Sequence, residues 1–287
     1  MLRQKRSRSS VSIVGPGRLG TALALSLRRA RWRVDSLVVR GKRGPSSRVA
    51  RLARQVGARI ADLGKTPPCA DVVWITAPDD AIAEVTARLA SNGDWRRKIV
   101  FHSSGALTSD VLAPLGERGA SVASVHPGMT FVSKSVPSMS GVPFGVEGDA
   151  RAVRLAKQII ADMGGTTITI HKKNKILYHA FDTFASPLLI GLMATLEQVG
   201  IAAGIPKSRI PTMAGPLLRR TLENYLEHGA ASAHSGALVR GDAVTIKRHL
   251  EALKATPHAR RAYVALARVI VRKLPVTNRK ALEKELR

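Results

Sequence analysis

The chain has 287 residues, of which 45% are hydrophobic, so it is long enough to bury the core of one or two domains. No apolar run reaches the roughly 18 residues that a membrane-spanning helix needs, and the single cysteine, Cys69, excludes an intrachain disulfide. The formal net charge of +26 is spread over both halves of the chain and only 4% of the residues are aromatic, which argues against specific nucleic-acid binding. We expect a cytoplasmic protein with a disordered basic tail over residues 1–10.

A glycine motif comes first in the chain. Residues 11–14 are strand-like and are followed by G-P-G-R-L-G at 15–20 and then by a helical pattern. This spacing is typical of a dinucleotide-binding turn, in which Gly15 makes the turn, Gly17 lets the phosphates approach and Gly20 lets helix pack on strand. We expect Arg18 and Leu19 to lie at the helix N-terminus that holds the pyrophosphate. The alternative is an ordinary glycine-rich turn.

The end of the second predicted strand bears on the identity of the cofactor. NAD-binding proteins carry an acidic residue there for the ribose hydroxyls, whereas this chain has a basic residue followed by a basic, hydroxyl-rich loop. Guanidinium and hydroxyl groups match the oxygens of a 2′-phosphate, so we expect NADP. The residues predicted to bind this phosphate are Arg40, Lys42, Arg43 and Ser46. A solvated basic loop is the alternative.

Later strands end in loops that we expect at the same edge of the sheet, where ligands of open α/β sheets bind. The first such loop contains Ala77 and Pro78, which are predicted to contact the cofactor through their backbone. Asp79 or Asp80 then caps the following helix.

Two further loops carry histidines. His102 and Ser104 are predicted to bind substrate, and Ser103 to lie beside the nicotinamide. Hydride transfer to a carbonyl or imine needs a proton donor, and His126, at the end of the next strand, is the candidate for this role. The alternative is that both histidines are loop residues bonded to backbone carbonyls.

The elements predicted along the chain change in type at about residue 170. Before it, strands alternate with helices, which is typical of a parallel sheet covered on both faces. Strands are expected at 12–14, 36–39, 72–76, 98–102, 121–125, 144–147 and 167–170, and helices at 19–29, 48–56, 81–90, 107–115 and 150–163. Only helices follow, at 173–200, 207–228, 242–253 and 258–273. The prediction is an α/β fold with a Rossmann-type domain over 11–170, followed by an all-helical domain over 171–287.

Several motifs together resemble a known family. The glycine motif, A-P-D-D at 77–80, F-H-S-S-G-A-L at 101–107, H-P-G-M-T-F at 126–131, K-I-L-Y-H-A-F-D-T-F-A-S at 175–186 and R-G-D-A-V-T-I-K-R-H-L at 240–250 resemble the Rossmann-like proteins with a DUF2520 domain. This resemblance implies kinship with pyrroline-carboxylate reductase, hydroxyisobutyrate dehydrogenase and prephenate dehydrogenase. It also implies a substrate between the domains and a homodimer formed by the helical domain.

The same resemblance places Lys175, Tyr178, His179 and Ser186 on the interdomain helix of the family, Lys175 and His179 as catalytic residues and the other two as substrate ligands. Together with position 182 they follow helical spacing, so they form one polar stripe, which is more typical of a site than of a buried face. Pro187 stands where relatives carry Asn and predicts a kink in the helix.

A second basic residue is a candidate for substrate binding. Arg240 precedes a helix that Asp242 is predicted to cap, and its guanidinium could hold a substrate carboxylate. The function expected is an NADP(H)-dependent oxidoreductase acting on a small, carboxylate-bearing carbonyl or imine. The alternative is a non-catalytic, NADP(H)-binding interaction or redox-sensing protein.

Overall fold

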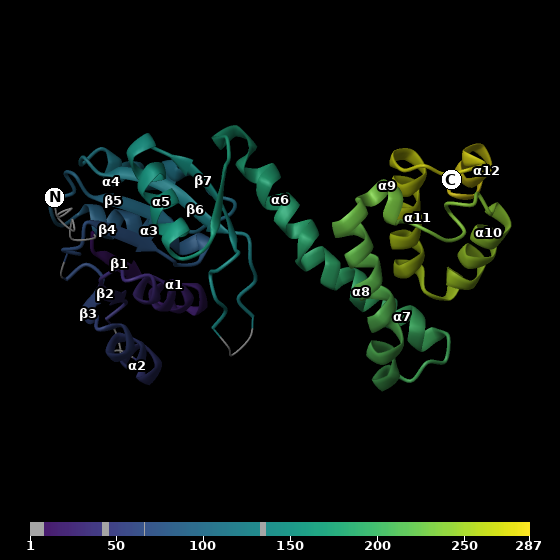
Figure 1. The fold of residues 1–287 in the computed structure, drawn as a ribbon, viewed down its shortest axis with the longest axis horizontal. Coiled ribbons are helices and arrows are strands. Elements are labelled where there is room, and N and C mark those ends of the chain that lie inside the picture. Colours follow the sequence, from purple (N-terminus) through teal and green to yellow (C-terminus); the bar gives the residue numbers. More distant parts are fainter. Residues whose placement is uncertain (1–8, 42–45, 66, 133–135) are drawn as a thin grey trace, which may run out of the picture. The chain divides into compact units, whose positions relative to one another are not determined.

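The computed structural model describes residues 9–41, 46–65, 67–132 and 136–287 (Figure 1). The chain forms two compact units, residues 1–183 and 184–287. The strands of the first unit are β1 (Val11–Val14), β2 (Val34–Val39), β3 (Arg59–Asp62), β4 (Val72–Ile75), β5 (Ile99–His102), β6 (Ser121–Pro127), β7 (Pro143–Gly148) and β8 (Thr166–Thr169). Its helices are α1 (Arg18–Arg29), α2 (Ser47–Val56), α3 (Asp79–Ala90), α4 (Ala113–Gly116), α5 (Ala150–Asp162) and α6 (Lys175–Ala185), of which the last ends just beyond the unit.

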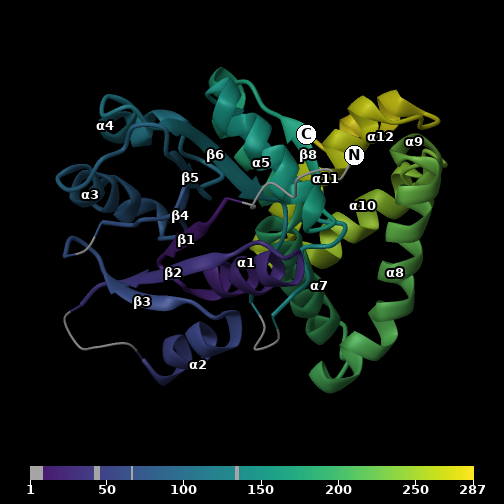
Figure 2. The same ribbon diagram turned by 60° about the vertical axis from the view of Figure 1, so that its left-hand side comes forward.

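The eight strands form one sheet in the order β3-β2-β1-β4-β5-β6-β7-β8, most of which is visible in Figure 2. All pairs are parallel except β6 with β7, which run antiparallel and place His126 opposite Gly145. This sheet confirms the predicted α/β class.

Both faces of the sheet are covered, which explains why its central strands read as continuous apolar runs. Successive side chains of a strand point to opposite faces. Ile13, Trp74 and Phe101 therefore pack with α1, α2 and α5, whereas Ile75 and Val100 pack with α3 and α4 on the other side. Because the strands from β1 to β6 are parallel, their carboxyl ends lie along one edge of the sheet. This edge carries the loops singled out in the sequence.

Three local predictions need correction. Strand β3 was not expected, because its R-I-A-D sequence is only partly buried at the sheet edge. The helix expected at 107–115 is a 3₁₀ turn, η1 (Ser109–Leu112), followed by the short α4. Pro78, not Asp79 or Asp80, is the N-cap of α3, because the carboxylate of Asp79 lies one residue inside the helix and accepts a hydrogen bond from Ser104 Oγ (2.8 Å).

The second unit contains only helices among its described elements. These are α7 (Pro187–Ala202), α8 (Ile210–His228), α9 (Ala230–Ala233), α10 (Ala243–Ala252), α11 (Pro257–Lys273) and α12 (Arg279–Glu285), with short 3₁₀ turns. Its core is small and is formed by side chains of α10, α11 and the C-terminal segment. Asp242 caps α10 as predicted, since its carboxylate accepts hydrogen bonds from the backbone N–H (3.0 Å) and the hydroxyl (2.7 Å) of Thr245.

A kink was predicted at Pro187, and the structure shows a break between two helices there. Ser186 leaves helical geometry, with φ −130° and ψ −78°, and Pro187 opens α7. The change from strands to helices comes at residue 170, as expected, whereas the two compact units divide after Thr183. The domain boundary itself stays a prediction.

The stretch Lys172–Ala202 corrects one expectation from the sequence. By length and composition it is long and apolar enough to cross a membrane, and only 6% of its most apolar window is buried. A core helix of a soluble protein passes the same test, so one such helix is weak evidence for a membrane span. The stretch also contains the turn at Ser186 and the fully buried Lys175.

Candidate functional site

A cavity of about 910 Å³ lies beside the glycine motif. The loop between β1 and α1 contributes Gly15, Gly17 and Arg18 to its lining, and the loop before α3 contributes Ala77 and Pro78. Helix α1 begins at Arg18 with no acidic residue in its first turn. The positive end of its dipole therefore faces the cavity without an internal counter-charge, as an anion site at a helix N-terminus requires.

The glycines of this loop fit the roles expected for a dinucleotide. Gly15 has φ +81°, which disfavours a side chain. A Cβ on Gly20 would lie 2.6 Å from Thr76 Oγ1 and 2.9 Å from Gly15 O, so this glycine brings helix and strand together. A Cβ on Gly17 would meet only Gly15 O, at 3.8 Å, so its outer side is open to an approaching group. Each glycine of the loop thus has a structural role of its own.

The predicted 2′-phosphate residues are only partly described. Arg40 lines the cavity, is exposed and contacts Glu84 (3.4 Å). Ser46 is the N-cap of α2 and accepts a hydrogen bond from Val49 N (3.4 Å). Lys42 and Arg43 lie outside the described residues.

One basic residue of the cavity was not among the predicted phosphate ligands. Arg48 lines the cavity with Arg18 and Arg40 and donates a hydrogen bond to Thr21 Oγ1 (3.1 Å). Its position at the first residue of the helix predicted over 48–56 was the only signal in the sequence. Three exposed guanidinium groups therefore surround this cavity.

Two other predicted cofactor residues have structural partners. Leu19 packs against the core of the sheet. Ser103 accepts a hydrogen bond from Trp74 Nε1 (2.8 Å) at the end of β5. Their contact with a cofactor stays a prediction.

A second group of polar side chains gathers around His126, at the end of β6. Its Nδ1 lies 3.0 Å from the hydroxyl of Tyr178 and 3.5 Å from Asp182 Oδ2, both on α6. The rings of Tyr178 and His179 meet the His126 ring edge-on, with centroids 5.7 Å and 6.1 Å away. Burial, helped by the nearby charges of Lys175 and His179, lowers the pKa of His126 to about 4. A neutral His126 at pH 7 accepts protons more readily than it donates them.

Lys175 is fully buried at the start of α6. Its ammonium donates a hydrogen bond to Ser124 Oγ (2.7 Å) and lies 5.4 Å from the centre of the Tyr178 ring. Burial lowers the pKa of Lys175, opposed by the charges of Glu147, Asp182 and Asp79. A fully buried lysine is rare unless it is paired, which distinguishes this position from the surface lysines of the chain.

His102 and Ser104 lie near this group but are committed to the fold. His102 is buried, its Nε2 donates to Thr108 O (3.1 Å) and its Nδ1 accepts from Ser104 N (3.2 Å). Both ring nitrogens are therefore used, as in the alternative considered from the sequence. Burial lowers the pKa of His102 to about 4. Ser104 Oγ donates to Asp79 and accepts from the backbone of Ala106 and Leu107.

Two glycines shape the His126 group and were not singled out in the sequence. A Cβ on Gly145 would lie 2.6 Å from Tyr178 Cζ, and one on Gly105 would lie 2.9 Å from His126 Nε2 and 2.6 Å from His179 Cδ2. Each glycine therefore makes room for an aromatic ring. Gly145 lies in no quoted motif. Gly105 belongs to the F-H-S-S-G-A-L motif, but that motif does not reveal its role, because the contacts arise from strand pairing and from α6.

Two predicted substrate ligands belong to the second unit. Ser186 precedes α7, and Arg240 lies exposed in the turn before α10. Whether they join the His126 group stays a prediction. No cluster of three His, Cys, Asp or Glu side chains able to hold a metal occurs among the residues that the structure describes.

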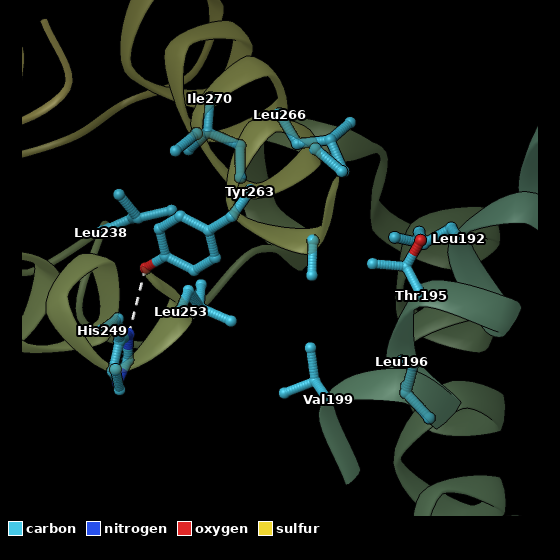
Figure 3. A pocket seen from close by; sticks show the side chains of 14 residues that line it. Leu192, Thr195, Leu196, Val199, Leu238, His249, Leu253, Tyr263, Leu266 and Ile270 are labelled. Atoms are coloured by element: carbon cyan, nitrogen blue, oxygen red, sulfur yellow. Dashed lines mark hydrogen bonds between the residues drawn. The ribbon is translucent and has the colours of Figure 1, made fainter. Parts of the chain in front are cut away.

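The second unit also has a pocket of its own, of about 560 Å³ (Figure 3). Apolar side chains of α7 and α11 line it, among them Leu196, Val199 and Leu266. Its polar groups are largely paired with one another, since His249 Nδ1 lies 3.1 Å from the Tyr263 hydroxyl.

Family models match most of the chain. A Rossmann-like domain matches residues 2–127, and the domain of unknown function DUF2520 matches residues 142–270. The chain is a Rossmann-like protein with a DUF2520 domain. The resemblance seen in the motifs is thereby confirmed. The DUF2520 match includes β7, α5 and β8 as well as the helices from α6 to most of α11. A search of curated proteins returns no match.

Solved structures share the fold of this Rossmann-like/DUF2520 protein at low sequence identity. A candidate NADP oxidoreductase from Bacteroides fragilis is 20% identical, with a TM-score of 0.73 over 92% of this chain and 98% of that one. A protein from Thermotoga maritima is 22% identical, with a TM-score of 0.73 over 96% and 100%. A reductive aminase from Aspergillus terreus, in complex with NADPH4, cyclohexanone and allyl amine, is 16% identical, with a TM-score of 0.61 over 98% and 100%.

Proposed function

We propose that this protein is an NADP(H)-dependent oxidoreductase that transfers a hydride to or from a small carbonyl or imine compound. The observation that carries the proposal is the cavity beside the glycine loop, in which each glycine meets a separate requirement of dinucleotide binding. The similar structures include an NADPH-bound reductive aminase and a pyrroline-5-carboxylate reductase, which supports this class of reaction.

Different residues of the cavity would bind different parts of the cofactor. The N-terminus of α1 with Arg18 would hold the pyrophosphate, and Arg40 with Arg48 would hold the 2′-phosphate that distinguishes NADP from NAD. When bound, the nicotinamide supplies or accepts the hydride. Ala77 and Pro78 would contact the cofactor through their backbone.

The partly buried group around His126 fits the proton transfer that accompanies hydride transfer. In oxidation of an alcohol or amine the site must accept a proton from oxygen or nitrogen, and in reduction it must return one. A neutral His126 suits the first role, and its conjugate acid performs the second. The buried ammonium of Lys175 stabilises negative charge that develops on the substrate, more strongly than it would in water.

We further propose a carboxylate-bearing substrate, held by Arg240, with Ser186 as a hydrogen-bonding partner. The hydroxyl of Tyr178, predicted as another substrate ligand, is instead taken up by His126 (3.0 Å). The guanidinium of Arg240 matches a carboxylate in shape and charge. The predicted position of the substrate between the domains, and the cytoplasmic location that a lone exposed Cys69 favours, stay proposals.

A homodimer formed by the helical domain is also proposed. Helix α7 has no buried side chain, and α8 buries only Ile210, although both carry many large apolar residues such as Leu188, Leu217 and Leu226. Exposed apolar surface of this extent is typical of a protein interface. Leu217→Glu should turn a dimer into a monomer in sedimentation experiments, whereas a wild type that sediments as a monomer would contradict the proposal.

The test of the function is a fluorescence titration with NADPH, followed by a screen of keto acids, aldehydes and cyclic imines for NADPH oxidation. We expect saturable binding and turnover of at least one class of compound. Absence of binding would overturn the proposal. Binding without turnover across the panel would instead favour a non-catalytic NADP(H)-binding protein.

A further inference from the structure

The hydrogen-bond partners of His126 Nδ1 are unusual in their polarity. The nearest polar atoms are the Tyr178 hydroxyl oxygen, at 3.0 Å, and Asp182 Oδ2, at 3.5 Å. A carboxylate can only accept hydrogen bonds, whereas a hydroxyl can both donate and accept. The position of the single proton on the neutral ring therefore depends on where the Tyr178 hydroxyl directs its own proton.

The groups around Tyr178 indicate the direction of its hydroxyl proton. Its pKa is raised, first by burial and then by the charge of Asp182 and a hydrogen bond to that carboxylate, and a hydrogen bond with the backbone of Gly145 opposes this rise. A hydroxyl has one proton to give and two lone pairs to fill. A hydroxyl proton directed to Asp182 leaves only lone pairs to face His126 Nδ1, so the ring is then the donor of the 3.0 Å contact.

The geometry around the Asp182 carboxylate gives a second reason for a proton on Nδ1. Among the residues that the structure describes, its buried Oδ2 has no partner with hydrogen-bond geometry, and His126 Nδ1 lies 3.5 Å away. A buried acceptor without a donor is costly. A proton on Nδ1 would face two acceptors, the Tyr178 oxygen and Asp182 Oδ2. An Nδ1 without a proton would instead place its own lone pair against the lone pairs of both oxygens.

The other ring nitrogen faces a different environment. His126 Nε2 lies beside Gly105, where a Cβ would approach it to 2.9 Å. The glycine therefore leaves space next to Nε2 that a side chain would fill. Titratable groups around the ring are Lys175 and His179 on α6 and His102 on β5, and the first two disfavour a second proton on it.

We propose that Asp182 and Tyr178 are positioning residues that fix the proton of His126 on Nδ1 and present Nε2 as the hydrogen-bond and proton acceptor. The role in the reaction rests on the proposed function. In the oxidising direction the substrate O–H or N–H proton passes to Nε2, the hydride leaves the carbon for the oxidised nicotinamide, and the C=O or C=N double bond forms. His126 then carries a proton on each nitrogen, and Asp182 opposes its positive charge.

The test begins with the tautomer itself. Long-range ¹H–¹⁵N correlation spectra of protein labelled in its histidines distinguish a ring protonated on Nδ1 from one protonated on Nε2, and need neither cofactor nor substrate. The His126 signals are assigned by their loss in His126→Asn. We expect wild-type His126 to carry its proton on Nδ1 at pH 7. A proton on Nε2 in the wild type would overturn the proposal, whatever happens to the variants.

Asp182→Asn provides the second arm, because the new amide can donate to Nδ1 and so reverse the preference. We expect the ring to shift toward the Nε2-protonated form and oxidative turnover to fall at least tenfold, with NADPH affinity unchanged. The matched control is Asp94→Asn, an exposed carboxylate that pairs with Arg96, which should change neither quantity.

The outcomes separate the two proposals. An unchanged tautomer in Asp182→Asn would overturn the positioning role, even if turnover fell. The expected tautomers in a wild-type protein that turns over no substrate would uphold the hydrogen-bond arrangement and overturn the proposed function instead.

Discussion

The cavity at the glycine loop and the polar group around His126 are built in opposite ways. The cavity is lined by the glycine loop, by apolar side chains and by three exposed arginines, and these groups lie mainly in the segments that follow β1, β2 and β4. The His126 group is formed by partly or fully buried side chains of β6 and α6, which lie some fifty residues apart in the sequence. An example is Lys175, which donates a hydrogen bond to Ser124. Backbone and exposed charge suit the recognition of a phosphate, whereas buried, paired side chains suit control of a proton.

Because the two regions have different roles, a substitution can impair one of them and leave the other intact. Damage to the glycine loop should abolish binding of the cofactor, and damage to the His126 group should reduce turnover with binding retained.

The largest effect is expected at Gly20. A Cβ there would lie 2.6 Å from Thr76 Oγ1, so Gly20→Ala must displace the loop from the strand. We expect NADPH affinity to fall by about 100-fold or more, equivalent to about 2.7 kcal/mol, in a fluorescence titration. Gly116→Ala is the matched control, because nothing lies within 4 Å of its Cβ position. Equal affinities for the two variants would contradict the placement of the cofactor.

Arg40 tests the choice between NADP and NAD. Arg40→Asp replaces a phosphate ligand by a carboxylate that repels the 2′-phosphate and can bind ribose hydroxyls. The ratio of NADPH to NADH affinity should fall by about 30-fold. Arg51→Asp, an exposed residue of α2, makes the same change in charge and should leave the ratio within about twofold. An unchanged ratio of NADPH to NADH affinity in Arg40→Asp would contradict the proposal that the cofactor is NADP.

A smaller effect is expected at Gly145, which belongs to the other region. Gly145→Ala would press on the Tyr178 ring, at 2.6 Å, and should lower the free energy of unfolding by about 2 kcal/mol. NADPH affinity should stay within about twofold of the wild type, because the residue is not part of the cavity lining. Loss of NADPH binding in a folded Gly145→Ala variant would show that the two regions are not separate.

The smallest effect concerns pH. His102 has a pKa of about 4 in the folded protein against 6.5 as an unperturbed side chain, so the unfolded state binds the extra proton first as pH falls below 6.5. Stability is therefore lost between pH 6.5 and 4, by about 1 to 2 kcal/mol from this residue at pH 5.5. Urea unfolding should show a shallower pH dependence in His102→Gln than in the wild type. Parallel curves would mean that His102 is not buried in its neutral form.

The two regions also differ in how far the sequence predicts them. The glycine loop, Arg40 and the loop at Ala77 were found from local spacing, because their roles depend on backbone geometry and on strand ends. Lys175, Tyr178 and position 182 were found as a polar stripe at helical spacing. Gly145 and Ser124 carry no local signal, and the motif that contains Gly105 does not reveal its role. Their contacts arise only when β6, β7 and α6 come together. The 3₁₀ turn at Ser109 was mistaken for a helix, because the buried Glu147 holds its backbone N–H from another strand (2.7 Å).

The most direct measurement compares NADPH affinity and turnover in Lys175→Met. Methionine keeps much of the length of the side chain but removes its buried charge, whereas Lys172→Met removes an exposed charge paired with Asp110 (2.6 Å) and serves as the control. We predict that kcat falls by about 100-fold or more in Lys175→Met, with the Kd for NADPH unchanged, and that Lys172→Met resembles the wild type. Wild-type kcat in Lys175→Met would contradict the account.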